Sequence, residues 1–278
     1  MKRNLFIIGT LIVGMLFISS ASAIAADKAE GKTNTETTQE NKGITPQPTN
    51  QKGKELPKGL EASDRKSLPP VSPPIYQPPL RGAPGGRVGG GTRGIGDELV
   101  TLFALAPNHV GLTTEEQPTL YWFLSNQTKY PIEVTFIIEG MIQPLLEKRL
   151  SVPIEPGIHS IHLRDLNLHL LKTTQYRWFV ALIPDPERRA KDIIAGGIIE
   201  RVELPEALRV KLSQGDPLNI PYIYAESGIW YDTIRAISEL IEADPNDMNL
   251  RKQRAALLEQ VGLSEVAQYE LKQAGLVQ

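Results

Sequence analysis

The sequence predicts a mainly β fold followed by helices, because three parts of the chain differ in composition and periodicity. Residues 26–95 are rich in polar residues, proline and glycine, residues 96–204 contain short β-prone runs, and residues 205–278 have a helical period. A parallel α/β sheet would need helices between its strands, and we predict no amphipathic helix before about residue 205. We therefore expect a disordered tether, an antiparallel β-sandwich and a helical subdomain, in that order.

The N-terminus has the pattern of an export signal. Lys2 and Arg3 precede an apolar stretch at residues 5–18, and small residues follow as far as Ala25. The apolar stretch is shorter than the ~20 residues of a spanning helix, and the small residues suit cleavage after Ala23 or Ala25. Residues 1–25 are thus predicted to be a signal peptide, with an uncleaved anchor as the alternative. The expected location is the periplasm, the cell envelope or the extracellular space.

Composition limits the classes of partner and of stabilisation. Without Lys2 and Arg3 the chain has 28 basic and 32 acidic residues, a net charge of −4, which does not favour nucleic acid as a partner. The chain has no cysteine, so disulfides and lipid attachment to a cysteine are excluded. Stability must come from buried apolar surface.

Residues 26–95 are predicted to be a tether. The first part is too polar to offset the entropy of ordering, and the proline-dense run at 69–84 should be extended. A glycine-rich segment then carries Arg81, Arg87 and Arg93 at six-residue spacing. These arginines either keep a flexible linker soluble or bind carboxylates or phosphates of the envelope. The phosphate-binding GxxxxGK[ST] motif is not present.

Seven β-prone runs predict an immunoglobulin-like antiparallel sandwich over residues 96–204. Turn residues separate the runs, which is typical of sandwiches. Gly196-Gly197 indicates a bulge or a close backbone approach. The predicted strands are residues 99–106, 119–124, 132–139, 145–152, 158–163, 175–183 and 193–202.

The helical part contains a weak 34-residue repeat, the tetratricopeptide period. Predicted helices cover residues 204–212, 222–243, 248–261 and 264–274. Residues 244–247 are expected to supply the N-terminal cap of the third helix, and Ser264 that of the fourth. Gly228 and Thr233 recur in type 34 residues later, as Gly262 and Ala267. Two such units are fewer than a free-standing array needs, so they should pack on the sandwich or on a partner. An ordinary helical hairpin is the alternative.

No residue cluster predicts catalysis, a cofactor or a metal. His159 and His162 lie three apart on a predicted strand and so point to opposite faces, which does not suit a metal site. Glu226-Ser227-Gly228 lacks the first glycine of a nucleophile elbow. The charged loop at residues 185–192 is expected to be a solvated, salt-bridged surface.

Trp230, Tyr231 and Asp232 form the second candidate binding segment, beside the three arginines. The two aromatic residues either anchor the junction between helices and sandwich or form a recognition surface. Asp232 is expected to be a local hydrogen-bond partner.

Several motifs between residues 78 and 276 form a recognisable combination. They are RGAPGGRVGGGTRG at 81–94, Pro118-Thr119, Tyr176-Arg177-Trp178, Asp185-Pro186, Arg201-Val202, Tyr224-Ala225, GIWYD at 228–232 and Val261-Gly262-Leu263. With these motifs the chain resembles a cyanobacterial exported family known as domain of unknown function 928. The resemblance implies export and the sandwich-plus-helices layout, and it transfers no catalytic residue. The chain has Pro184 and Ile198 where many members have cysteine and tryptophan.

Two functions remain open from the sequence. The first is a non-enzymatic interaction module that binds another exported protein or a cell-wall polymer. The second is a carbohydrate-binding or carbohydrate-active domain that stacks sugars on Trp122, Trp178 or Trp230. Exposure of these tryptophans discriminates the two.

Overall fold

The computed structural model describes residues 72–79, 85–95 and 98–276, with residues 91–95 and 98 described by their backbone alone. These residues belong to one compact unit, Glu61–Gln278. The strands are β1 (Arg87–Gly89), β2 (Gly91–Ile95), β3 (Glu98–Ala104), β4 (Gly111–Thr113), β5 (Thr119–Leu124), β6 (Ile132–Ile138), β7 (Leu146–Leu150), β8 (Gly157–His162), β9 (Gln175–Leu182) and β10 (Ile193–Arg201). The helices are α1 (Glu206–Gln214), α2 (Ile220–Glu226), α3 (Trp230–Ala243), α4 (Met248–Gln260) and α5 (Ser264–Gln273).

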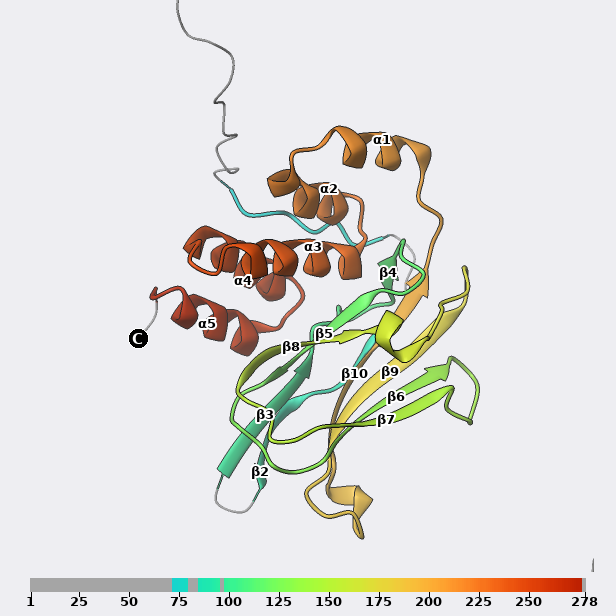
Figure 1. Cartoon of the computed structure of the whole chain (residues 1–278), viewed down its shortest axis with the longest axis vertical. Helices are drawn as coiled ribbons and strands as arrows, with labels where there is room; N and C mark the ends of the chain where they lie inside the picture. Colours follow the sequence, from blue (N-terminus) through green and yellow to red (C-terminus); the bar gives the residue numbers. More distant parts are fainter. Residues whose placement is uncertain (1–71, 80–84, 96–97, 277–278) are drawn as a thin grey trace, which may run out of the picture. The chain divides into compact units, whose positions relative to one another are not determined.

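The described strands form two sheets (Figure 1). The larger has six strands in the order β1-β10-β9-β6-β7, with β4 also paired to β10, and the smaller has the order β2-β3-β5-β8. All pairs are antiparallel except β4 with β10, which is parallel. The seven predicted strands are confirmed as β3 and β5 to β10, whereas the prediction of a purely antiparallel sandwich is wrong at β4.

The N-terminal limit of the predicted sandwich is also wrong, because β1 and β2 fall within the predicted tether. Their ladders depend on backbone groups, and glycine lets the backbones approach closely. A Cβ at Gly89 would lie 2.0 Å from the carbonyl oxygen of Ile194. Residues 72–79 also pack on the folded part, with Pro74 and Tyr76 buried. Residues 26–71 and 80–84 of the predicted tether, and the predicted signal peptide, lie outside the described residues.

The predicted helix at 222–243 is two helices. Gly228 lies between α2 and α3 at φ +73°, a left-handed conformation that interrupts a helix. The cap expected from residues 244–247 is present, and it is Asp247, which accepts a hydrogen bond from the N–H of Asn249 at the start of α4. The predicted cap at Ser264 is wrong, because its hydroxyl donates to Glu259 Oε1 instead.

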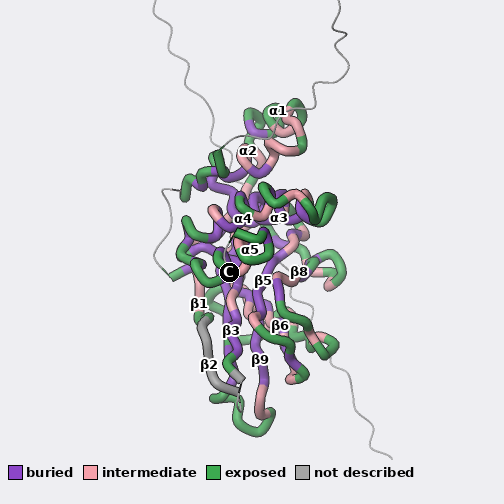
Figure 2. The backbone as a smooth tube through the Cα atoms, turned by 90° about the vertical axis from the view of Figure 1, so that its left-hand side faces the viewer, coloured by how far each residue is buried: buried purple, intermediate pink, exposed green. Residues whose placement is uncertain are grey.

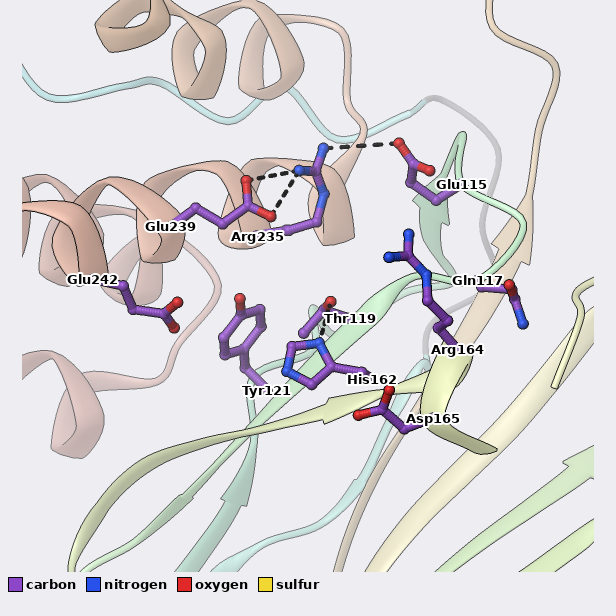
Figure 3. A pocket seen from close by; sticks show the side chains of 10 residues that line it. All are labelled: Glu115, Gln117, Thr119, Tyr121, His162, Arg164, Asp165, Arg235, Glu239 and Glu242. Atoms are coloured by element: carbon purple, nitrogen blue, oxygen red, sulfur yellow. Dashed lines mark hydrogen bonds and ion pairs between the residues drawn. The ribbon is translucent and has the colours of Figure 1, made fainter. Parts of the chain in front are cut away.

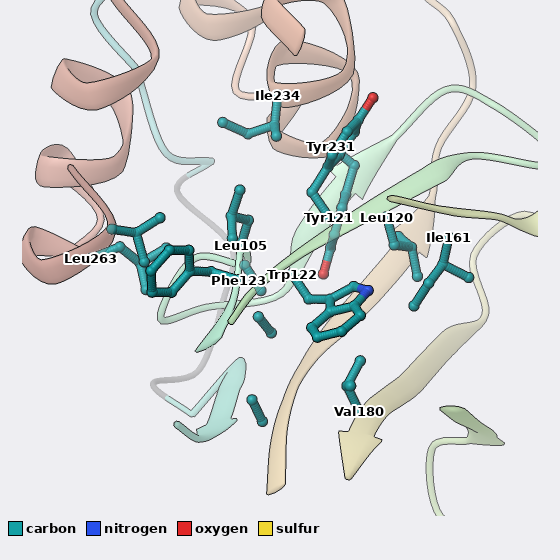
Figure 4. Close-up of a cluster of buried hydrophobic side chains, with 14 of the residues drawn as sticks. Leu105, Leu120, Tyr121, Trp122, Phe123, Ile161, Val180, Tyr231, Ile234 and Leu263 are labelled. Atoms are coloured by element: carbon teal, nitrogen blue, oxygen red, sulfur yellow. The ribbon is translucent and has the colours of Figure 1, made fainter. Parts of the chain in front are cut away.

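Strand β5 is buried on both faces and connects the helices with the larger sheet. Trp122 points toward Val180 of β9, while Phe123 lies next to Leu263 on the helical side (Figure 4). The rings of Phe123 and Tyr269 of α5 meet edge to face, with centroids 5.0 Å apart. One buried cluster thus includes residues of both sheets and of α3 to α5, and Figure 2 shows this continuous buried interior. The boundary near residue 204 separates strands from helices in sequence but does not separate two cores.

The Gly196-Gly197 pair marks a close approach. The register of β9 and β10 continues through both glycines, so there is no bulge. A Cβ on Gly197 would lie 2.5 Å from Ala106 Cβ and 2.9 Å from the Tyr231 hydroxyl. This glycine lets the start of α3 contact the sheet.

Candidate functional site

The second predicted binding segment, Trp230 to Asp232, forms the junction between helices and sheets. The Trp230 indole donates to the carbonyl of Leu105 at 2.8 Å. The Tyr231 hydroxyl accepts from the Trp178 indole at 2.9 Å and donates to the carbonyl of Ile198 at 3.1 Å. Both aromatic side chains are buried. They are core anchors, and the recognition-surface alternative does not fit their burial.

Asp232 is enclosed next to these anchors. Its carboxylate accepts from the backbone N–H of Thr114 at 3.0 Å and from the Thr114 hydroxyl at 3.1 Å. Burial raises the pKa of this carboxyl to about 6, although the positive charge of Arg235 opposes the shift. Asp232 therefore connects α3 to the segment after β4, which agrees with its expected role as a local hydrogen-bond partner.

Of the three arginines of the glycine-rich segment, only Arg87 has a described side chain. Arg81 lies outside the described residues, and Arg93 is described only as a backbone position in β2. Arg87 donates to the carbonyls of Ala106 at 3.2 Å, Val261 at 3.0 Å and Gly262 at 3.2 Å. Partial burial lowers the pKa of this guanidinium. Arg87 thus joins β1 to the end of α4, and its guanidinium fork is already engaged within the chain.

The histidines do not converge. His159 packs its ring against Trp122 with centroids 4.7 Å apart, whereas the exposed His162 forms a hydrogen bond with the Thr119 hydroxyl at 3.0 Å. Across the described residues, no group of three or more His, Asp or Glu side chains could hold a metal ion. No described helix is long and apolar enough to cross a membrane.

The loop between β9 and β10 is the salt-bridged surface that its charges predict. Asp185 pairs with Arg188 at 3.5 Å and with Lys191 at 3.4 Å. Arg189 pairs with Asp192 at 2.6 Å and with Glu133 of β6 at 2.9 Å. These charges pair with one another, and all but the buried Asp192 lie at the surface.

A polar cleft between α3 and the smaller sheet is the candidate site (Figure 3). Its volume is about 430 Å³, and its residues come from segments far apart in sequence. Helix α3 supplies one wall, β5 and β8 the floor, and the loop before β5 and the turn after β8 the other wall. The lining residues are Glu115, Gln117, Thr119, Tyr121, His162, Arg164, Asp165, Arg235, Glu239 and Glu242.

The residue pattern of the sequence does not predict this cleft. Arg235, Glu239 and Glu242 follow one another at spacings of four and three, so they share a face of α3. That spacing was the one available signal in the sequence. The residues that oppose them across the cleft are brought there by sheet pairing alone.

The charges of the cleft are partly paired. Arg235 Nη1 donates to both oxygens of Glu239, at 2.8 and 3.0 Å, and Arg235 Nη2 lies 3.8 Å from Glu115. Figure 3 shows Glu242, Arg164 and Asp165 around the same space. The side chains of these three residues form no hydrogen bond or ion pair within the described part of the chain. They remain available to a ligand.

Tyr121 forms part of the cleft floor. Its ring is buried, and burial together with the nearby charges of Glu242 and Glu239 raises its pKa to about 12. With four acidic and two arginine side chains in the lining, the cleft is negative. Such a lining attracts a cationic group.

The three tryptophans proposed for sugar stacking are all buried. Trp122, Trp178 and Trp230 have exposed fractions of 1%, 0% and 0%. None presents a ring face to solvent. Stacking of sugars on one of these three tryptophans is therefore not possible in this structure.

A model of a protein family described as Domain of Unknown Function (DUF928) matches residues 88–271. The match covers well over half of the chain. The chain belongs to the DUF928 family. No curated protein is detectably similar to it.

The DUF928 match includes every residue of the cleft and the GIWYD segment. It begins after Arg87 and does not include residues 72–79. The cleft is thus a feature of the DUF928 domain, whereas the buried Tyr76 belongs to a segment outside the match.

Proposed function

We propose that this DUF928 protein is an exported cell-envelope protein whose folded part is a non-enzymatic module that binds another exported protein. The predicted signal peptide at residues 1–25 and the resemblance to a cyanobacterial exported family support export, to the periplasm, cell envelope or extracellular space. In this proposal the two sheets are an immunoglobulin-like sandwich. The pairs α2–α3 and α4–α5 are two tetratricopeptide-like units.

The observation that carries the proposal is the cleft beneath α3. Glu242 and Asp165 supply unpaired negative charge, and Arg164 supplies an unpaired positive charge beside them. A partner segment with a lysine or arginine side chain and a nearby acidic group would pair with all three. Pairing of this kind favours recognition of a protein surface.

The other residues that suggested chemistry have structural roles that support a non-enzymatic function. Asp232 binds Thr114, and Arg87 binds three backbone carbonyls. Ser227 ends α2 with its hydroxyl donating to the carbonyl of Ile223 at 2.7 Å. Each of these groups is occupied by the fold itself.

The experiment is a crosslinking pull-down from intact cells that make the tagged protein. The test variant combines Glu242→Lys with Asp165→Lys, because neither side chain has a partner to lose. The matched control is Glu187→Lys, an exposed acid on the charged loop after β9. We expect one exported protein to be recovered by the native chain and the control and lost at least tenfold in the test variant.

Equal recovery by the test variant would contradict the assignment of the cleft. Recovery of glycan without protein would favour the carbohydrate alternative. Circular dichroism of each variant establishes that its fold is retained.

A further inference from the structure

Residues 72–79 lie along the helices as an extended segment (Figure 1). Pro74 and Tyr76 are buried, while Pro73, Ile75 and Gln77 are exposed. Two alternate side chains, Pro74 and Tyr76, therefore enter the helical surface, while Ser72 and Pro78 on either side of them are exposed. This alternation is the way an extended peptide binds in a groove.

The groove binds the backbone of the segment. The Gln260 side-chain amide accepts from the Tyr76 N–H at 2.8 Å and donates to the carbonyl of Pro74 at 2.9 Å. The carbonyl of Ala225 accepts from the Gln77 N–H at 3.0 Å. The Tyr222 hydroxyl donates to the carbonyl of Ser72 at 2.8 Å. These hydrogen bonds recognise the backbone of an extended segment. They do not depend on which side chains stand at the exposed positions.

Specificity comes from one aromatic anchor. Tyr76 is 7% exposed, and its ring meets Trp230 edge to face with centroids 4.9 Å apart. Its hydroxyl lies 3.3 Å from His109 Nε2. The pocket therefore has an apolar wall and a polar end, which together suit a tyrosine side chain.

Gly228 makes room for the segment. A Cβ at this position would lie 2.7 Å from the carbonyl oxygen of Gln77 and 3.4 Å from Pro79 Cδ. The peptide thus crosses directly over the turn between α2 and α3. The groove between α2, α3 and α4 thus fits the backbone of an extended, proline-rich segment.

We propose that this groove is a recognition site for extended, proline-rich segments with an aromatic anchor, that residues 72–79 occupy it in cis, and that a partner protein's segment of the same chemistry displaces them. The seated segment shows what fits: Pro74 and Tyr76 point inward, and the positions around them vary freely. Covalent attachment gives the cis segment an effective concentration of about millimolar, so it excludes weak competitors. This surface is separate from the cleft beneath α3, and the inference goes beyond the proposed function.

The test uses the chain from Ala26 onward with a protease recognition sequence inserted between residues 80 and 84. The chain is cut after folding, and the probe is a fluorescent peptide of residues 69–79. We expect saturable one-to-one binding to the cut chain and binding about a hundredfold weaker to the uncut chain. The Tyr76→Ala peptide should bind at least tenfold more weakly, and the Ile75→Ala peptide should bind as the native one does, because Ile75 is exposed.

Two protein variants give an independent readout. Gln260→Ala should weaken binding to the cut chain at least tenfold, whereas Gln273→Ala, an exposed glutamine on α5, should have no effect. The uncut Tyr76→Ala chain should bind the native peptide about as tightly as the cut chain does, because its cis segment has lost the anchor.

Three results would overturn the inference. The first is that neither the cut chain nor the uncut Tyr76→Ala chain binds the peptide. The second is equal binding of the Tyr76→Ala peptide. The third is self-association of the uncut chain that Tyr76→Ala abolishes, since the occupant would then be a second copy of this chain.

Discussion

The indole of Trp178 in β9 donates a hydrogen bond to the hydroxyl of Tyr231 in α3, with a donor–acceptor distance of 2.9 Å and both groups buried. The same hydroxyl donates onward to the carbonyl of Ile198 in β10 at 3.1 Å. The first turn of α3 is thereby attached to two central strands of the larger sheet. This chain of bonds determines how the helices and the sheets share one core.

Tyr231→Phe should lower the free energy of unfolding by ~1–3 kcal/mol, because it leaves the buried Trp178 N–H without an acceptor. Tyr130→Phe is the matched control, since the hydroxyl of this partly exposed tyrosine forms no hydrogen bond to a described residue. Urea denaturation of both variants measures the difference. Equal stability of the two variants would show that the Trp178–Tyr231 bond contributes nothing.

Gly228→Ala should destabilise the protein more than Gly262→Ala. Both glycines have left-handed φ, +73° and +72°, so both variants carry a conformational penalty of ~1–2 kcal/mol. At Gly228 the new methyl group would also overlap the carbonyl of Gln77 at 2.7 Å, whereas the nearest atom at Gly262 is 3.8 Å away. Thermal and chemical denaturation should therefore show that Gly228→Ala is less stable than Gly262→Ala. Equal stability of the two variants would mean that residues 72–79 move away from the new methyl group without loss of folding free energy.

Arg254 and Glu270 form a buried ion pair between α4 and α5, with a shortest distance of 2.9 Å. Arg254→Met alone should cost ~3–5 kcal/mol of folding free energy, because it leaves a carboxylate that is 1% exposed without its main partner. The double variant with Glu270→Leu should lose much less than the two single variants combined. A double-mutant cycle in denaturant measures this coupling, and simple additivity would contradict it.

Asp232 should make stability fall as the pH rises from about 4 to about 6. Burial raises its pKa from 3.8 to about 6 in the folded protein, so over this window the folded state binds more protons than the unfolded state. The stabilisation from the protonated Asp232 is fully present below its unfolded-state pKa and is lost as the pH rises through its folded-state pKa. The free energy of unfolding should change by up to about 3 kcal/mol over this range.

The measurement is the unfolding free energy of the native chain and of Asp232→Asn between pH 3.5 and pH 7. Their difference isolates this carboxyl from the other acids that titrate in the same range. A constant difference across the window would show that the Asp232 pKa is not raised.

The sequence predicted elements where side chains dominate the local preference. The run at residues 132–138 is rich in β-branched residues, the run at residues 175–182 contains three aromatic residues, and both form strands. Asp247 begins α4 because its side chain caps the first turn. Strands β1, β2 and β4 were missed because they are short and glycine-containing, so backbone pairing with distant strands decides their conformation.

The candidate sites follow the same division. The GIWYD segment was recognisable from its aromatic density, and its anchoring role follows from burial. The cleft was not recognisable, since Glu242 and Asp165 lie 77 residues apart in the sequence. The segment around Tyr76 reads as polar, proline-rich linker, and its insertion beside Trp230 depends on a groove made by three helices.

The sequence by itself determined the order of strands before helices, the absence of disulfides and the strong local structure, because these depend on residue type and short-range spacing. Only the tertiary structure decided that the helices share one core with the sheets, that Arg87 is engaged by backbone carbonyls and that residues 72–79 fill a groove. The physical reason is that close approach at Gly197 and Gly228, and the burial of Trp178 against Tyr231, arise between residues far apart in the chain. The local conformational preference of a glycine does not indicate which distant segment of backbone will pack against it.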